Sequence, residues 1–210
     1  MKAIFNFNRK NGVQKKIEDL EFVILDTETT GLNLEKDRIL SIGALKLYQG
    51  RLKVKEAFEV YVKQEHFSKD SVPIHGLLQE SVSHQISEKT AVEMLRAYIG
   101  EAIIIGHHIR FDMEVLRRAF LRHDLTPIPN LCLDTGMLYR KTLLKTPLLR
   151  KKEHYSLDDL ARRFDLNCKD RHTALGDAYL TAMAFQHILE LLYAKGDISI
   201  KKLRDWGQVG

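Results

Sequence analysis

The sequence predicts an α/β protein in which a mixed β-sheet is flanked by helices. Segments near the N-terminus alternate apolar and polar residues and are joined by short turns, which is typical of antiparallel strands. From residue 88 onward, segments with helical spacing of apolar residues alternate with short apolar runs. The chain has 210 residues, of which 44% are hydrophobic and 29% are charged. These values fit one folded domain with a substantial core.

Three segments are expected to form an antiparallel meander. Residues Glu21–Asp26 are short, apolar and bounded by charges, which suits a buried strand. Arg38–Tyr48 alternates well enough for a second strand, and Gln49-Gly50 signals a turn. Leu52–Val62 alternates again and is predicted to form the third strand.

Helices and strands then alternate. Val92, Leu95 and Ile99 lie at helical spacing within Glu88–Ile99. The remaining predicted elements are a strand at Ala102–Ile105, a helix at Asp112–His123, a strand at Leu131–Leu133, a helix that opens at Ser156, and a helix at Ala174–Ala194. Ser156 suits an N-cap, and Asp159 holds the capping-box position. The sheet therefore has five predicted strands.

The folded domain is expected to span residues 21–195, between an N-terminal arm at 1–20 and a tail at 196–210. Trp206 in the tail is expected to fold back on the domain. The segment from Arg140 to Lys152 is strongly basic. It is either a solvated loop or a loop that contacts phosphates, and the sequence leaves both open.

Charge and cysteine content restrict the class of protein. The formal net charge of +5 permits a polyanionic partner without establishing one. Cys132 and Cys168 have no metal-ligand spacing, and two thiols in a chain of this length predict a reduced, cytoplasmic protein without a disulfide scaffold. No apolar stretch approaches the roughly 18 residues that a membrane span requires, so no membrane association is expected.

Two carboxylates, Asp26 and Glu28, end the first predicted strand. Residues i and i+2 of a strand project from the same face, so these side chains lie together. Two carboxylates at such a short distance raise each other's pKa unless a cation compensates their charge. Mg²⁺ and Mn²⁺ prefer oxygen ligands of this kind. A D-x-E pair usually lies on the protein surface without a functional role. Here its place at the end of an apolar strand, before Thr-Thr-Gly, favours a metal site.

Two further acids, Asp112 and Asp177, lie near the starts of predicted helices. Asp112 follows Gly106, where the backbone can turn, and it begins a predicted helix in which an acid also favours the helix dipole. His172 precedes the last long helix, and Asp177 lies one to one-and-a-half turns into it. This spacing can bring both side chains to one site, although a lone histidine is more often an ordinary surface or core residue.

Together, these motifs resemble the DEDD family of 3′→5′ exonucleases. D-T-E-T-T-G, H-x-x-x-F-D and H-x-A-x-x-D occur in this order, and the resemblance covers about Glu21 to Leu192. The set is most similar to the histidine subclass, which includes the proofreading epsilon subunit of bacterial DNA polymerase III. The resemblance implies an RNase H-like fold with a five-stranded mixed sheet that begins with three antiparallel strands. The coarse element order predicted from the residues agrees with it.

The resemblance also implies catalytic roles. Asp26, Glu28, Asp112 and Asp177 match the acidic ligands of two divalent cations, Mg²⁺ or Mn²⁺, and His172 matches the general base. Two such cations can activate water, hold the scissile phosphate and stabilise the leaving 3′-oxygen. A histidine with a pKa near neutrality can accept the proton of the attacking water. The expected product is a nucleoside 5′-monophosphate.

Other positions match family contacts with the 3′-terminal nucleotide. Thr29 and the backbone around Thr30 match a turn that contacts the terminal sugar, and Leu32 matches a side chain that wedges against the terminal base. His75, in Ile-His-Gly-Leu, matches a histidine beside the nucleotide, but it also suits an ordinary helix start within a loop.

His107 and Phe111 are expected to line the same nucleotide pocket, Phe111 by stacking or packing. The chain departs from the family at His108, where asparagine is usual. This departure leaves the predicted metal ligands intact, but it puts in doubt a polar contact near the terminal nucleotide.

Three functions remain open from the sequence. The first is an exonuclease acting on single-stranded or frayed DNA 3′ ends, and the second is an enzyme of the same family that trims RNA 3′ ends. The third is a nucleic-acid-binding module without catalysis, which is disfavoured because all four acids and the histidine are present. A DNA polymerase partner is a further open point, because the C-terminal segment by which epsilon binds its polymerase has no counterpart here.

Overall fold

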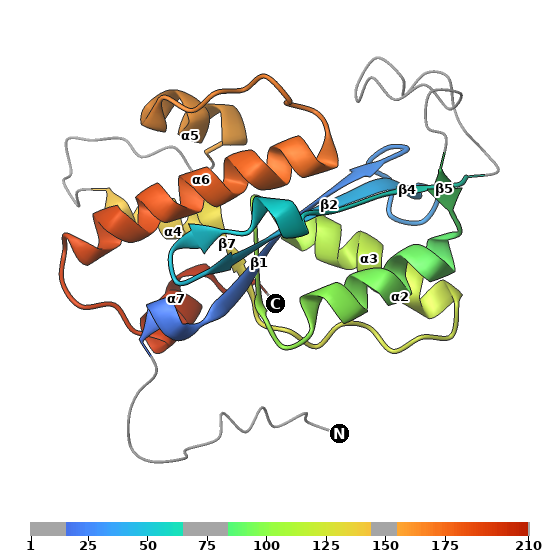
Figure 1. Cartoon of the computed structure of the whole chain (residues 1–210), viewed down its shortest axis with the longest axis horizontal. Helices are drawn as coiled ribbons and strands as arrows, with labels where there is room; N and C mark the ends of the chain where they lie inside the picture. The colour runs from blue at the N-terminus through green and yellow to red at the C-terminus, as the bar shows by residue number, and fades with distance from the viewer. Residues whose placement is uncertain (1–15, 65–83, 144–154, 210) are drawn as a thin grey trace, which may run out of the picture.

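The protein is built around one mixed β-sheet (Figure 1). The computed structural model describes residues 16–64, 84–143 and 155–209. The strand order is β5-β4-β2-β1-β6-β7, and β3 pairs with β2 beside this path. The strands are β1 (Glu21–Thr29), β2 (Ile39–Tyr48), β3 (Arg51–Leu52), β4 (Phe58–Val62), β5 (Gln85–Ile86), β6 (Ile103–Gly106) and β7 (Cys132–Asp134).

The central strand is β1, which runs antiparallel to β2 and parallel to β6. Strand β4 is antiparallel to β2, whereas β5 is parallel to β4 and β7 is parallel to β6. Each of the five predicted strands has a counterpart here, and the short β5 adds to them. The predicted mixed sheet with three antiparallel strands first is therefore present.

The prediction of one continuous strand over Leu52–Val62 was wrong. The short helical turn η2 (Val54–Glu56) separates β3 from β4. Strand β3 pairs with the end of β2, at Leu47 and Tyr48, whereas β4 pairs with β2 only from Ala44 back to Ser41. Because the chain leaves the sheet between these two stretches, Val54 is 56% exposed despite the alternating pattern.

The described helices are α2 (Glu88–Ile99), α3 (Arg110–Arg122), α4 (Thr135–Thr142), α5 (Leu157–Phe164), α6 (Ala174–Tyr193) and α7 (Ile200–Gly207). The capping box predicted at the start of α5 is confirmed. The Ser156 hydroxyl accepts a bond from the Asp159 N–H, and the Asp159 carboxylate accepts one from the Ser156 N–H, each 3.1 Å long.

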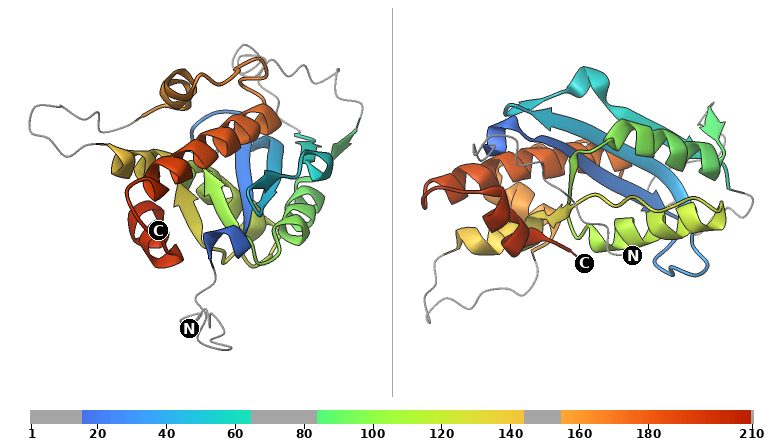
Figure 2. Two further views of the ribbon diagram at one scale, coloured as in Figure 1. Left: turned by 60° about the vertical axis from the view of Figure 1, so that its left-hand side comes forward. Right: turned by 90° about the horizontal axis from the view of Figure 1, so that it is seen from below.

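The helices cover both faces of the sheet (Figure 2). On one face, α2 and α3 pack against Val23 and Leu25 of β1. On the other face, α4, α6 and α7 pack against Phe22 and Ile24. Because the first half of β1 is buried on both faces, Phe22–Leu25 is a continuous apolar run and does not alternate.

The C-terminal segment packs on the domain. Helix α7 lies against α4 and β7, and Trp206 is half-buried against the core that α6 covers, as expected. The Val209 N–H then donates to the Cys132 carbonyl at 3.2 Å, at the edge of the sheet.

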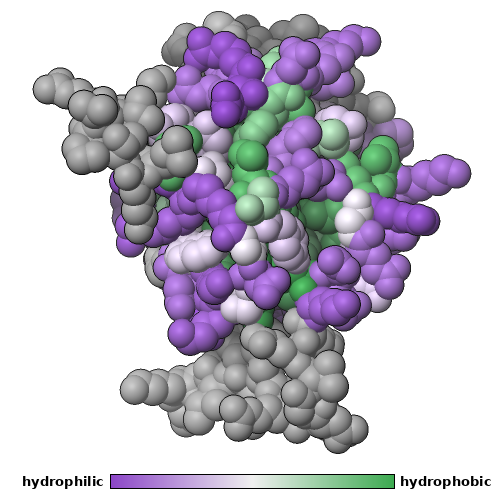
Figure 3. Space-filling view, turned by 90° about the vertical axis from the view of Figure 1, so that its left-hand side faces the viewer, coloured by the Kyte–Doolittle hydropathy of each residue, from purple (hydrophilic) through white to green (hydrophobic). Residues whose placement is uncertain are grey.

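Both cysteines are free. The face that looks left in Figure 1 is mainly hydrophilic, with a narrow hydrophobic band across it (Figure 3). None of the described helices is both long and apolar enough to cross a bilayer.

Candidate active site

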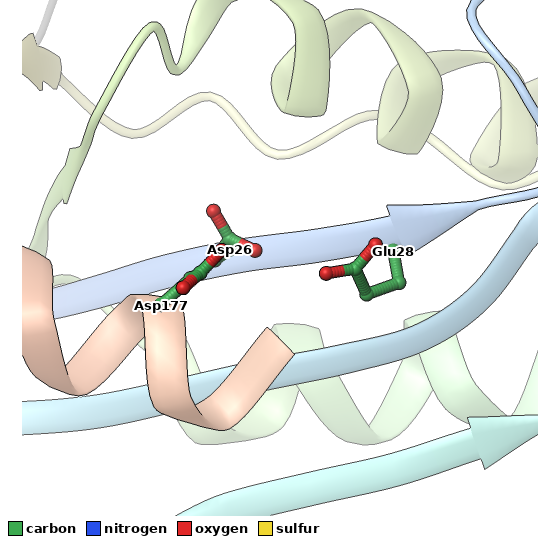
Figure 4. Close-up of side chains that lie close together, drawn as sticks. All are labelled: Asp26, Glu28 and Asp177. Atoms are coloured by element: carbon green, nitrogen blue, oxygen red, sulfur yellow. The ribbon is translucent and has the colours of Figure 1, made fainter. Parts of the chain in front are cut away.

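Three carboxylates meet where β1 faces the start of α6. Asp26 and Glu28 continue the face of β1 that carries Phe22 and Ile24, so both side chains turn toward α6 (Figure 4). Asp177, in the first turn of α6, projects toward them from the opposite side. One oxygen from each of these carboxylates lies within 4.8 Å of the others.

A glycine allows α6 to come this close to the sheet. Gly43 of β2 lies directly opposite Asp26 in the β1–β2 pair. A Cβ at position 43 would stand 2.2 Å from both the Ala174 carbonyl carbon and the Leu175 nitrogen. The first turn of α6 therefore rests on a strand without a side chain at that point. Helix capping fixes the same turn, because the Thr173 hydroxyl accepts a bond from the Gly176 N–H at 3.1 Å.

The electrostatics of this cluster are unfavourable without a cation. Burial raises the pKa of Asp26 well above its ordinary value, and the charges of Asp112, Asp177 and Glu28 raise it further. Burial, followed by Asp177 and Asp112, raises the pKa of Glu28 to about 7. A carboxyl shifted in this way by burial and like charges is characteristic of sites that bind cations or transfer protons.

One positive side chain opposes this repulsion. The Arg171 guanidinium pairs with the Asp177 carboxylate, and its Nε donates to Asp158 at 2.8 Å. Arg171 therefore links the start of α5 to the carboxylate cluster. Its charge lowers the pKa of both Asp26 and Glu28, although by less than burial raises them.

Asp112, the fourth predicted acid, lies beside the cluster and is held by β1 itself. Its Oδ1 accepts a 2.7 Å bond from the Thr27 hydroxyl and a 3.0 Å bond from the Thr27 N–H. Burial raises the pKa of Asp112 to about 6 against the opposing effect of these bonds. Asp112 is outside the group of three carboxylates within 4.8 Å, yet its charge acts on both Asp26 and Glu28.

His172 lies between Arg171 and the cap of α6 in a left-handed backbone conformation, with φ at 65°. Its N–H donates to the second oxygen of Asp177 at 3.4 Å, and its side chain is exposed. The predicted general base is therefore adjacent in the chain to the residues that hold Asp177.

The predicted nucleotide-contacting loop begins directly after the two acids of β1. The Thr29 hydroxyl donates to the Gly31 carbonyl at 2.7 Å, and the Thr30 hydroxyl donates to Asp37 at 2.8 Å. Leu32 is 83% exposed, the most of any large hydrophobic side chain in the described ranges. His75 lies outside the described residues. The basic segment from Arg140 to Lys152 also lies outside them from residue 144 onward.

His107 is half-buried between β6 and α3. The Thr135 hydroxyl donates to the Gly106 carbonyl at 3.2 Å and contacts His107 Nδ1 at 2.9 Å. Burial, and next the stacked His108 ring, lower the pKa of His107 to about 4, so this ring is neutral at pH 7. Phe111 packs partly against the core beneath α3.

Sequence reasoning missed three residues that organise the site, namely Thr27, Gly43 and Arg171. Thr27 is the middle residue of D-x-E, and the strand period does place it on the opposite face from the two acids. Gly43 and Arg171 act through contacts with α6 and α5, and no local pattern indicates such contacts.

Residues 23–185 match the model of the family described as Exonuclease. The chain belongs to this exonuclease family. The predicted resemblance is thereby confirmed, as is the prediction that the chain is a nuclease. The roles of individual site residues remain predictions.

Curated relatives of this exonuclease domain include much longer proteins. An epsilon-like protein of DNA polymerase III from Rhodobacter capsulatus is 32% identical over 184 residues, covering 86% of this chain and 25% of that protein. A PolC-type DNA polymerase III from Thermotoga maritima is 31% identical over 190 residues, covering 89% of this chain and 13% of that protein. The chain thus spans a quarter or less of these relatives.

Solved structures confirm the RNase H-like exonuclease fold. Escherichia coli Exonuclease I in complex with a dT13 oligonucleotide matches with a TM-score of 0.69 and 20% identity, over 84% of this chain and 43% of that one. Exonuclease X in complex with 5′-overhanging duplex DNA matches with a TM-score of 0.64 and 21% identity, over 88% of this chain and 98% of that one.

Proposed function

We propose that this exonuclease domain removes nucleotides from DNA 3′ ends in the 3′→5′ direction and releases nucleoside 5′-monophosphates. The observation that carries the proposal is the convergence of Asp26, Glu28 and Asp177 within 4.8 Å. Three carboxylates this close, with the pKa of Glu28 raised to about 7, are an expensive arrangement for a domain that only binds or scaffolds.

The donor chemistry fits divalent cations. Carboxylate oxygens are the ligands that Mg²⁺ and Mn²⁺ prefer. Asp26, Glu28 and Asp177 would hold the cations, and Asp112 would complete the set of ligands for two of them. A bound cation would supply a Lewis acid that polarises a phosphate oxygen and a water molecule.

The remaining chemistry falls to side chains around this cluster. Hydrolysis joins the oxygen of a water molecule to phosphorus and breaks the bond from phosphorus to the 3′-oxygen. His172, exposed beside Asp177, would accept the proton of the water. Thr29, Thr30 and Leu32 would hold the terminal nucleotide, together with His75, His107 and Phe111.

The choice of DNA as substrate rests on the relatives. The related proteins are named as DNA polymerase III components, and both structural neighbours described above were solved with DNA. We further propose that the domain works in the cytoplasm, on single-stranded or frayed ends, beside a polymerase. RNA 3′ ends are the alternative substrate that the experiment must test.

One gel assay tests this proposal. Purified protein is incubated with 5′-labelled single-stranded DNA or the matched RNA, in Mg²⁺, in Mn²⁺ and in EDTA. We expect a ladder that shortens from the 3′ end, depends on metal and is lost in Asp26→Ala. Asp205→Ala, which removes an exposed acid from α7, is the matched control and should cut like wild type. Faster cleavage of RNA would reassign the substrate, and a folded protein that cuts neither strand would refute the proposed activity.

A further inference from the structure

The loop that follows β1 is a closed turn. The Thr30 N–H donates to the Arg38 carbonyl at 2.9 Å, and the Arg38 N–H donates to the Thr30 hydroxyl at 3.0 Å. Within the turn, the Asn33 side chain accepts bonds from the Glu35 and Lys36 N–H groups. Its two ends are therefore tied together, and its middle has internal bonds of its own.

The carboxylate of Asp37 occupies the inside of this turn. One oxygen accepts the Thr30 hydroxyl at 2.8 Å, and the other accepts the Asn33 N–H at 2.6 Å. A Cβ on Gly31 would stand 2.6 Å from Asp37 Oδ2, so the chain passes tightly around the carboxylate at that residue. Asp37 thus bonds to both sides of the segment that carries Leu32.

Two leucines of the loop have opposite environments. Leu34 packs against the core beneath α3, whereas Leu32 is 83% exposed. Leu32 lies only four residues beyond Glu28, on the segment that Asp37 braces. An apolar side chain held in solvent by a braced turn, on the segment that directly follows the acidic residues of β1, is suited to contact with an apolar ligand surface such as the face of a nucleobase.

We propose that Asp37 is a positioning residue, which braces the Thr30–Asn33 segment so that Leu32 meets the terminal base of the substrate. The proposal rests on the function proposed above. Asp37 contacts neither substrate nor metal ligand in this scheme, and it acts through the Thr30–Asn33 segment, mainly by placing Leu32. Loosening the turn should therefore weaken substrate binding and leave the carboxylate cluster unaffected.

A double-mutant cycle separates positioning from a merely structural role. The variants are Asp37→Ala, Leu32→Ala and the two combined, each first shown to be folded by circular dichroism. The probe is a single-stranded DNA with 2-aminopurine as its 3′-terminal base, bound in Ca²⁺ so that affinity is measured without rapid cleavage. KM and kcat are then measured in Mg²⁺ with the same strand.

We expect each single variant to raise Kd and KM about tenfold, the scale for losing one small apolar contact. The fluorescence change of 2-aminopurine on binding should fall in both, and kcat should change less than about twofold. The loss in the combined variant should be clearly smaller than the product of the two single losses, because Asp37 acts mainly through Leu32. Additive losses, or a fall in kcat at unchanged KM, would overturn the proposal.

Two further variants make the test specific. Asp37→Asn should stay within about threefold of wild type, because its carbonyl can accept the Asn33 N–H while its amide donates to the Thr30 hydroxyl. Glu35→Gln is the matched control, since it removes a charge from the same loop and weakens only the contact with Arg118 on α3. A loss in Glu35→Gln equal to that in Asp37→Ala would assign the effect to charge and overturn the proposal.

The failures are distinguishable. A wild-type protein that neither binds nor cuts the strand would refute the proposed function, and this inference with it. A wild-type protein that cuts, together with an Asp37→Ala variant of unchanged Kd, would refute only the role of Asp37.

Discussion

Gly43→Ala should disable the site by displacing α6. The added Cβ would stand 2.2 Å from two backbone atoms at the start of α6, and ordinary contact begins at 3.4 Å. Strand and helix must therefore separate by about 1.2 Å, the difference between these two distances. Backbone cannot rotate away as a flexible side chain can, and α6 carries Asp177 in the same turn.

The expected effects follow from this displacement. Overpacking of a well-packed contact reduces the free energy of unfolding by about 1–3 kcal/mol. A shift of about 1 Å in a catalytic group lowers rates on the order of a hundredfold. Gly43→Ala should therefore remain folded at 20 °C, bind Mn²⁺ more weakly and cut DNA about a hundred times more slowly.

Urea unfolding, Mn²⁺ titration calorimetry and the gel assay measure these three quantities. Gly207→Ala is the matched control, since its Cβ would meet the Leu138 side chain at 2.8 Å, away from the site. It should lose some stability and keep the wild-type rate per folded molecule. A folded Gly43→Ala protein with wild-type metal affinity and rate would refute the claim that this close approach sets the position of Asp177.

Three other predictions concern the charges of the site. Thr27→Val should lower the free energy of unfolding by about 1–3 kcal/mol in urea titrations, because the buried Asp112 carboxylate loses its hydroxyl donor. Arg171→Gln should destabilise the protein in EDTA at pH 8 by a similar amount, whereas Asp158→Asn, which alters the exposed end of the same link, should have a smaller effect. Folding raises the pKa of Glu28 from 4.5 to about 7, so the folded state binds this proton more readily, and stability in EDTA should fall as pH rises from about 4.5 to 7. Glu28→Gln should remove that part of the fall and gain about 1–2 kcal/mol at pH 8, after allowance for solvent screening, and an unchanged pH profile would contradict the assigned cause.

The order of elements was predictable because the main strands and long helices carry strong periodic patterns. Helices α4 and α7 were not predicted. Each has eight residues, as α5 does, but neither carries the capping box that marks the start of α5 in the sequence. Their helical form depends on packing against α6 and β7, which no local pattern encodes.

The candidate site was predictable where it depends on local geometry. The strand period alone places Asp26 and Glu28 on one face, and the helix start places Asp177 near His172. The bond between Thr27 and Asp112 joins residues 85 positions apart, and the contact of Gly43 with α6 spans more than a hundred. These contacts appear only once the chain is folded.

The carboxylate cluster is held by backbone contacts as well as by side-chain rotamers. Strand β1 is fixed by two packed faces, α6 rests on the neighbouring strand β2 at Gly43, and the Thr27 N–H donates to the Asp112 carboxylate. Such a framework can keep like charges together at a cost in stability, because moving one acid away means moving a whole element. Removing a charge, as in Glu28→Gln, should therefore stabilise the protein and abolish catalysis together, and a variant that gained stability while keeping its rate would show that Glu28 is not part of the catalytic machinery.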